Sequence, residues 1–283
     1  EKSSYPEASC VMDKNFVSLC VTYLDNFESS ARLLASKLNL PLLDYEEATN
    51  NDRLILVVSD LGLAVQQSGK NTPGPIRCNF SGGAVNHRRL YGGGRNQDIA
   101  KAVGIGSSSS KLLVMDLTAG LGRDGFVLAS LGATVLMIER NPVVSALLGD
   151  GLARARKTSA DNGVDLEKIL KRISLISTDA VLYLKSLDEI SRPDVIYLDP
   201  MFPSRGKSSK VKKEMQLLHQ LVGFDEDGDS LLFLAKEKAR YRVVVKRSVH
   251  APFLADQKPG YSLKGKSTRF DVYPLKKMPS CTL

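Results

Sequence analysis

The clearest chemistry in this sequence lies in five consecutive residues, Asp199-Pro200-Met201-Phe202-Pro203. They follow residues 194–198, a short apolar run typical of a buried strand, and the prolines end that strand and stiffen the turn after it. Ligands of open α/β sheets bind at this edge. A carboxylate and a carbonyl there can accept the hydrogens of an exocyclic amine while the Phe202 ring stacks on its base. Taken alone, the five residues fit a plain strand end with a core Phe about equally well.

A glycine-rich loop lies upstream, between a predicted strand and a predicted helix. Its glycines have the G-x-G-x-x-G spacing, which lets backbone amides approach an adenosine-containing cofactor: Gly120, Gly122 and Gly125. Glu139 ends the next strand, where a carboxylate can accept both ribose hydroxyls. Asp179 follows the third strand and is a candidate partner for the adenine amine.

Two cofactors fit such a loop, a dinucleotide or S-adenosylmethionine. The glycine spacing alone would also serve NAD. The carboxylate of Asp124 would repel a pyrophosphate but tolerate a cationic sulfonium. Together with the Asp-Pro-Met-Phe-Pro motif, this favours S-adenosylmethionine and a methyltransferase, with an NAD-dependent oxidoreductase as the alternative.

Strands and helices alternate through most of the chain, which predicts an α/β fold with a parallel sheet covered on both faces. Strands are expected at residues 112–117, 134–138, 173–177, 194–198, 242–246 and 268–273, and helices at 125–131, 142–155, 166–170, 180–187, 210–221 and 230–239. We expect three segments: a small α/β module (1–80), a Gly/Arg-rich connector with a short helix (81–110) and a Rossmann-like domain (111–283). Within the module, residues 10–24 have strand-like content, 28–38 helical spacing, and 54–59 a strand with 61–67 as hairpin partner.

The composition favours a polyanionic partner, because the net charge is +8 and the pI is near 9.2. No apolar run approaches the ~20 residues that span a bilayer, so no membrane association is expected. The four cysteines are scattered and only three histidines occur. We therefore expect no metal site and a reducing, cytoplasmic location.

Two basic segments are candidates for contact with the phosphates of a nucleic acid. Their alternatives are a flexible linker and a solvated charge run. The candidate residues are His87, Arg88, Arg89 and Arg95 in the connector, and Arg205, Lys207, Lys210, Lys212 and Lys213 after the motif. Lys246 and Arg247 are expected to extend the same phosphate-binding groove.

Four long stretches resemble the family of bacterial ribosomal RNA small-subunit methyltransferase J: SGGAVNHRRLYGGGRNQDIAKAVG, DLTAGLGRDGFVLASLGATVLMIERNPVVSALLGDGLARA, VIYLDPMFP and VKKEMQLLHQLVG. The resemblance covers roughly residues 80–273. It implies a Rossmann-like class I S-adenosylmethionine-dependent methyltransferase fold with a small N-terminal α/β module. It also implies methylation of N2 of a guanine in 16S ribosomal RNA, with that RNA or the small ribosomal subunit as partner.

The resemblance also implies residue roles. Cofactor contacts carry over to Arg123, Asp124, Glu139, Arg140, Asp179, Ala180 and Asp199. Asp199 and the Pro200 carbonyl would accept the amine hydrogens, and Phe202 would stack on the guanine. Met201 departs from the second proline found across amino-group methylases, which puts the local turn shape in doubt. A methylase of another base in RNA or DNA, or a non-catalytic RNA-binding protein, remains an alternative.

Overall fold

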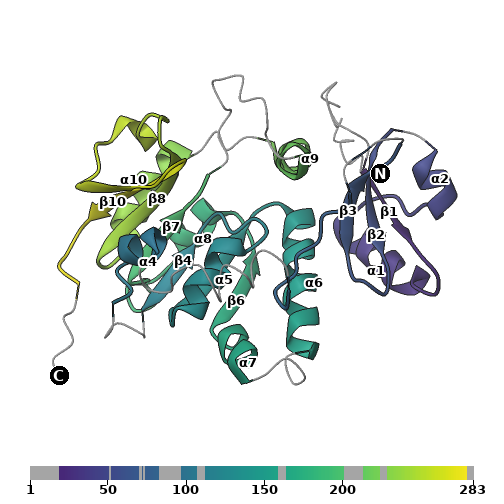
Figure 1. Cartoon of the computed structure of the whole chain (residues 1–283), viewed down its shortest axis with the longest axis horizontal. Coiled ribbons are helices and arrows are strands. Elements are labelled where there is room, and N and C mark those ends of the chain that lie inside the picture. Colours follow the sequence, from purple (N-terminus) through teal and green to yellow (C-terminus); the bar gives the residue numbers. More distant parts are fainter. Residues whose placement is uncertain are drawn as a thin grey trace, which may run out of the picture.

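The computed structural model describes most of the chain. The described residues are 19–50, 52–69, 72, 74–82, 97–106, 112–158, 164–200, 213–223 and 228–278, with the backbone alone for 164 and 213–216. They form two sheets, a small one in the N-terminal module and a large one in the rest of the chain (Figure 1). None of the helices in these ranges is long and apolar enough to cross a membrane.

Within residues 19–80, as far as the structure describes them, the N-terminal module is a three-stranded sheet with two helices. Its strands have the order β1-β2-β3, and β1 pairs parallel and β3 antiparallel with β2. The elements are β1 (Leu19–Tyr23), α1 (Glu28–Leu38), α2 (Tyr45–Thr49), β2 (Leu54–Val58) and β3 (Ala64–Gln67). The predicted helix 28–38 and the hairpin partner after residue 61 are confirmed. Helix α2 was not predicted, since five residues are too few to show a helical period.

The large sheet has seven strands in the order β6-β5-β4-β7-β8-β10-β9. Its strands are β4 (Leu113–Asp116), β5 (Thr134–Glu139), β6 (Ile173–Ser177), β7 (Val195–Leu198), β8 (Arg242–Ser248), β9 (Tyr261–Lys264) and β10 (Thr268–Pro274). The first five in this order are parallel, as predicted. β10 pairs antiparallel with β8 and with β9 on its other side, and β9 was not predicted. Between β8 and β10 the chain forms a 3₁₀ turn, η2 (Leu254–Asp256), and strand β9, but no crossover helix, so β10 returns antiparallel to β8.

Side chains alternate between the two faces of this sheet. Val195 and Tyr197 of β7 join one core cluster, and Ile196 and Leu198 join the other. The helices are α4 (Asp98–Val103), α5 (Arg123–Ser130), α6 (Pro142–Thr158) and α7 (Val164–Leu170) on the first face, α8 (Ala180–Ser186) and α10 (Gly228–Lys238) on the second, and α9 (Lys213–Val222) beside the first cluster. Both faces are therefore covered, which confirms the predicted layers.

The N-terminal module lies against α6 (Figure 1). Asp150 accepts a hydrogen bond from the Leu63 amide at 3.0 Å and pairs with Arg154 at 2.8 Å. Arg154 in turn donates to the Cys78 carbonyl at 2.6 Å. A Cβ on Gly151 would lie 2.4 Å from the Cys78 Cβ, so the close approach requires glycine. One turn of α6 thus holds the chain that leads out of the module.

This contact predicts opposite effects for two glycines of the same helix. Gly151→Ala should lower stability by about 1–3 kcal/mol, because the added methyl group overpacks against Cys78. Gly149→Ala is the matched control, since its Cβ would meet nothing closer than 3.8 Å. It should gain up to about 1 kcal/mol from helix propensity. Denaturant unfolding of both variants measures this, and equal stability would contradict the packing account.

Candidate active site

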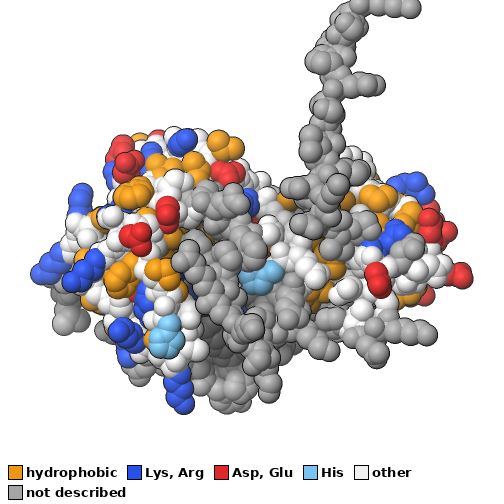
Figure 2. Space-filling model, turned by 90° about the horizontal axis from the view of Figure 1, so that it is seen from above, with side chains coloured by type: hydrophobic (Ala, Val, Ile, Leu, Met, Phe, Trp, Pro, Cys, Tyr) orange, Lys and Arg blue, Asp and Glu red, His pale blue; other side chains and the backbone are white. Residues whose placement is uncertain are grey.

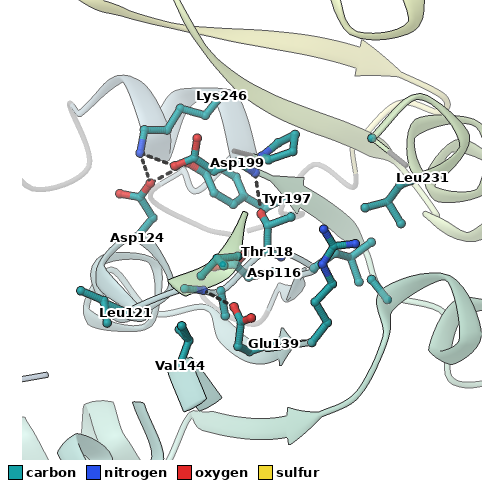
Figure 3. Close-up of a pocket in the computed structure, with 18 of the residues that line it drawn as sticks. Asp116, Thr118, Leu121, Asp124, Glu139, Val144, Tyr197, Asp199, Leu231 and Lys246 are labelled. Carbon is teal, nitrogen blue, oxygen red and sulfur yellow. Dashed lines mark hydrogen bonds and ion pairs between the residues drawn. The ribbon is translucent and has the colours of Figure 1, made fainter. Parts of the chain in front are cut away.

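The candidate site lies at the carboxyl ends of β4 and β7. The chain runs from β4 to β5 and β6 on one side and reaches β7 on the other, so the strand order reverses between β4 and β7. Such a switch point is where open α/β sheets bind ligands. A cavity of about 290 Å³ opens there (Figure 3). Its apolar walls come from separate elements and include Leu121, Val144, Leu218, Val222 and Leu231.

The glycine loop is held against the end of β5. Gly120, in a left-handed conformation with φ +55°, donates its amide to Glu139 Oε2 at 2.8 Å. The other carboxylate oxygen, Oε1, accepts the Asn141 amide at 2.8 Å. Glu139 is only 6% exposed, and both it and Gly120 line the cavity. The carboxylate is thus fixed in place beside the loop.

The other two glycines of the motif serve packing. Gly122 is not among the residues that line the cavity, and its contact with a cofactor stays a prediction. It begins α5 in a left-handed conformation, and a Cβ there would lie 2.5 Å from Leu148 Cδ1. A Cβ on Gly125 would lie 2.5 Å from Met137 Cε. These glycines let α5 lie close to its neighbours, and only the first faces the cavity.

Lys246 joins two carboxylates across the cavity (Figure 3). Its Nζ donates to Asp124 Oδ2 and to Asp199 Oδ2, each at 2.7 Å. Asp124 Oδ2 also accepts the hydroxyl of fully buried Tyr197 at 2.8 Å. Burial by itself lowers the pKa of Lys246, but Asp199 and then Asp124 outweigh it, so that this pKa is raised. The ammonium therefore stays charged and fixes the orientation of Asp199.

The motif is also fixed through its backbone. The Asp199 amide donates to Thr118 Oγ1 at 2.6 Å, and the Leu117 amide donates to the Tyr197 carbonyl at 3.1 Å. The end of β7 and the start of the glycine loop are thus bonded directly to each other. Pro200 follows and lines the cavity.

Asp116, at the end of β4, is an acid that sequence reasoning did not select. It is 2% exposed, and its Oδ1 accepts the Thr118 amide at 3.2 Å. Burial raises its pKa to about 8, and the nearby carboxylates of Asp124 and Asp199 add to the rise. Near neutral pH this carboxyl group therefore retains a proton in the folded protein.

The predicted cofactor residues gather in this one cavity, apart from Gly122. Lining it are Gly120, Arg123, Asp124, Glu139, Arg140, Asp179, Ala180 and Asp199. Asp179 also caps α8, where its Oδ1 accepts the Leu182 amide at 2.9 Å. The structure thereby brings residues from the ends of four strands together, although their individual contacts with a cofactor stay predictions.

Other predicted residues lie outside the description or elsewhere in the fold. Phe202, His87, Arg88, Arg89, Arg95, Arg205, Lys207, Lys210 and Lys212 are outside the described residues, and Lys213 is described by its backbone alone. Arg247 does not form a phosphate groove: it is 9% exposed, and its guanidinium donates to the Pro252 carbonyl at 2.9 Å. Lys246 points into the cavity and pairs with carboxylates, which corrects its expected place on the RNA surface.

Sequence reasoning missed Asp116, Thr118 and Tyr197 as parts of the site. Alternation along β7 could have placed Tyr197 on one face, but nothing local indicates that its hydroxyl meets Asp124. Lys246 follows three valines in β8, where a lysine in a buried strand is itself a signal, since buried charges are rarely left without partners.

The raised pKa of Asp116 predicts a pH-dependent stability. A carboxyl group with a folded-state pKa near 8 stabilises the fold at low pH, and this stabilisation is lost as pH rises through about 8. Asp116→Asn is uncharged at every pH. Its melting temperature relative to wild type should therefore rise between pH 6 and pH 9. The control is Asp60→Asn at an exposed turn, which should show no such trend. A pH-independent difference for Asp116→Asn would contradict the assignment.

Comparison with known proteins identifies the family. A model of SAM-dependent methyltransferases matches residues 34–275. Ribosomal RNA small subunit methyltransferase J of Cellvibrio japonicus is 49% identical over 265 residues, 93% of this chain and 99% of that protein. The protein of the same name from Pseudomonas aeruginosa PAO1 is 48% identical over 247 residues, 87% of this chain and 90% of that one.

The crystal structure of a SAM-dependent methyltransferase from Neisseria gonorrhoeae has a TM-score of 0.67 and 35% identity, and covers 90% of this chain and 95% of that chain. These matches confirm the predicted fold class. They also decide between the two candidate cofactors in favour of S-adenosylmethionine. The chain belongs to the ribosomal RNA small subunit methyltransferase J family of S-adenosylmethionine-dependent methyltransferases.

Proposed function

We propose that this protein methylates the N2 amine of a guanine in 16S ribosomal RNA, at the position numbered 1516. The name shared by its relatives supports ribosomal RNA as the substrate. The observation that carries the chemistry is the ion-paired Asp199 at the end of β7, fixed by Lys246 beside the glycine loop. The protein would act in the cytoplasm, where ribosomal subunits are assembled and used.

The residues of the cavity fit S-adenosylmethionine. The carboxylates of Asp124 and Asp199 share one ammonium, that of Lys246, and this acidic surplus suits the positive sulfonium and amino groups of the cofactor. Glu139, fixed by two backbone amides, would accept the ribose hydroxyls. Asp179 and Arg140 would lie around the adenine end. When bound, S-adenosylmethionine supplies an electrophilic methyl group.

Asp199 suits guanine as the target base. An ionised carboxylate only accepts hydrogen bonds. Guanine presents two adjacent donors, N1–H and N2–H, on one edge, whereas adenine places the N1 acceptor next to its N6 amine. Asp199 can therefore accept both guanine donors, while adenine would leave an acceptor facing an acceptor.

The remaining catalytic task is to activate and aim the amine. The N2 lone pair is delocalised into the guanine ring and is a poor nucleophile. Hydrogen bonds from the amine to Asp199 and to the Pro200 carbonyl would increase electron density on nitrogen and orient it. After methyl transfer, Asp199 or a water molecule accepts the proton that the amine loses. The target base must be unstacked to enter the cavity.

Methyl transfer tests the proposal directly. Labelled S-adenosylmethionine is incubated with 16S ribosomal RNA, free or in subunits, from cells that lack this activity, and the modified nucleoside is identified. We expect N2-methylguanosine from wild type and a loss of about 10²-fold or more in kcat for Asp199→Ala. Asp60→Asn at the exposed turn serves as the control and should be fully active. Methylation of a different atom, or a fully active Asp199→Ala, would disprove the assignment.

Removing the charge of Lys246 should change how the methylation rate depends on pH. Lys246→Met removes the ammonium that pairs with Asp124 and Asp199, so the repulsion between these two carboxylates and nearby Asp116 increases. Proton uptake is then favoured. The acidic limb of the rate–pH profile should move to higher pH, with activity recovering toward pH 9. Lys246→Arg keeps the charge and should leave that limb near its wild-type position. An unmoved limb in the Met variant would show that the lysine serves packing alone.

A further inference from the structure

Two surface segments lie beyond the carboxyl end of β8, beside the cavity. Residues 249–253 follow β8 directly, and residues 265–267 form the turn between β9 and β10. Thr268 pairs with Ser248, and the Val249 amide donates to the Ser267 carbonyl at 3.2 Å, so both segments lie together at this edge. Lys246, which lines the cavity, precedes the end of β8 by two residues, or roughly 7 Å.

Two buried arginines hold the first segment in place. Arg269 Nη1 donates to the carbonyls of Val249 at 2.8 Å and Ala251 at 2.7 Å, and Arg247 Nη2 donates to that of Pro252 at 2.9 Å. Arg269 also pairs with fully buried Asp271 at 2.9 Å. Burying such charges is costly unless their hydrogen bonds are satisfied. The carbonyls of Val249, Ala251 and Pro252 accept these hydrogen bonds, which fixes the shape of this segment.

The fixed segments present an aromatic ring and positive charge to solvent. Phe253 is 37% exposed, and the Arg269 guanidinium lies 4.8 Å from its ring centroid. His250, Lys264 and Lys266 are exposed. Acidic groups nearby include exposed Asp256 and half-buried Asp98. The Asp98 Oδ2 lies 3.6 Å from the Cβ position of Gly265. Buried Asp271 is paired with Arg269. On the face seen in Figure 2, Lys and Arg side chains gather along the outer margin of the larger domain.

A second contact joins this surface to the cavity. The Ala255 amide donates to Asp229 Oδ1 at 2.8 Å, at the start of α10. Gly228 and Leu231 of the same helix line the cavity. The surface therefore borders the site through β8 and through α10.

We propose that residues 249–253 and 264–267, together the clamped surface, bind the RNA strand next to the target base. Lys264 and Lys266 contact its phosphates, and Phe253 stacks on a neighbouring base. A strand whose target base is flipped into the cavity leaves neighbouring bases unpaired, with exposed faces for stacking. The inference rests on the RNA substrate of the proposed function and adds where that RNA is held.

Binding of fluorescently labelled, unmodified 16S ribosomal RNA tests the surface separately from catalysis. The double variant Lys264→Ala/Lys266→Ala should weaken RNA binding. It should also lower the slope of log Kd against log salt by about 1.4, the value expected for the loss of two phosphate contacts on a single strand. Phe253→Leu keeps an apolar side chain over Arg269 but removes the ring, and should weaken binding by about tenfold. Both variants should keep the wild-type affinity for S-adenosylhomocysteine, which shows that they fold.

The matched control is Lys157→Ala/Lys168→Ala, which removes two exposed lysines at the opposite edge of the sheet. Wild-type RNA affinity in both clamped-surface variants, or an equal loss in the control, overturns the proposal. If the variants bind RNA more weakly but the wild-type protein does not methylate the RNA, the surface is retained and the proposed function is rejected. If the wild-type protein methylates the RNA and the variants bind it normally, the proposed function is retained and the surface is rejected.

Discussion

The ammonium of Lys246 between Asp124 and Asp199 is the interaction on which the site depends. It connects three elements that are distant in the sequence: the first turn of α5, the end of β7 and the interior of β8. Without the cation, two carboxylates and buried Asp116 would face one another in a cavity with largely apolar walls. The ion pairs thus allow acidic groups to be concentrated where, in the proposed reaction, a cationic cofactor and a base amine would meet.

A second constraint acts through backbone amides. Glu139 accepts one amide from the glycine loop and one from the residue before α6, and the loop is also bonded to β7. The acid assigned to ribose and the motif assigned to the base are therefore positioned by the same short loop. Two of its three glycines, Gly122 and Gly125, leave room for Leu148 and Met137. The G-x-G-x-x-G spacing therefore mainly indicates that α5 packs closely against its neighbours.

Much of the fold could be predicted because its signals are local. Apolar runs mark β4 to β8, Pro142 marks the start of α6, and the acids at strand ends mark the cavity. The unpredicted parts depend on contacts between distant residues. Neither the antiparallel return of β10 nor the pairing of Lys246 with Asp199 has a signature in its own segment. Arg247 is a further example: its charge suggested a place in the phosphate-binding groove, but its side chain is buried.

Asp116 makes the charge of the cavity depend on what occupies it. With a pKa of about 8, this carboxyl group is close to equal populations of its two forms just above neutral pH. A cation nearby favours the ionised form, so by thermodynamic linkage the arrival of a positively charged ligand releases a proton. Loss of the methyl group would remove the positive charge on sulfur, and this would favour the protonated carboxyl group again. In the proposed reaction, the charge on Asp116 would thus follow the charge on the cofactor.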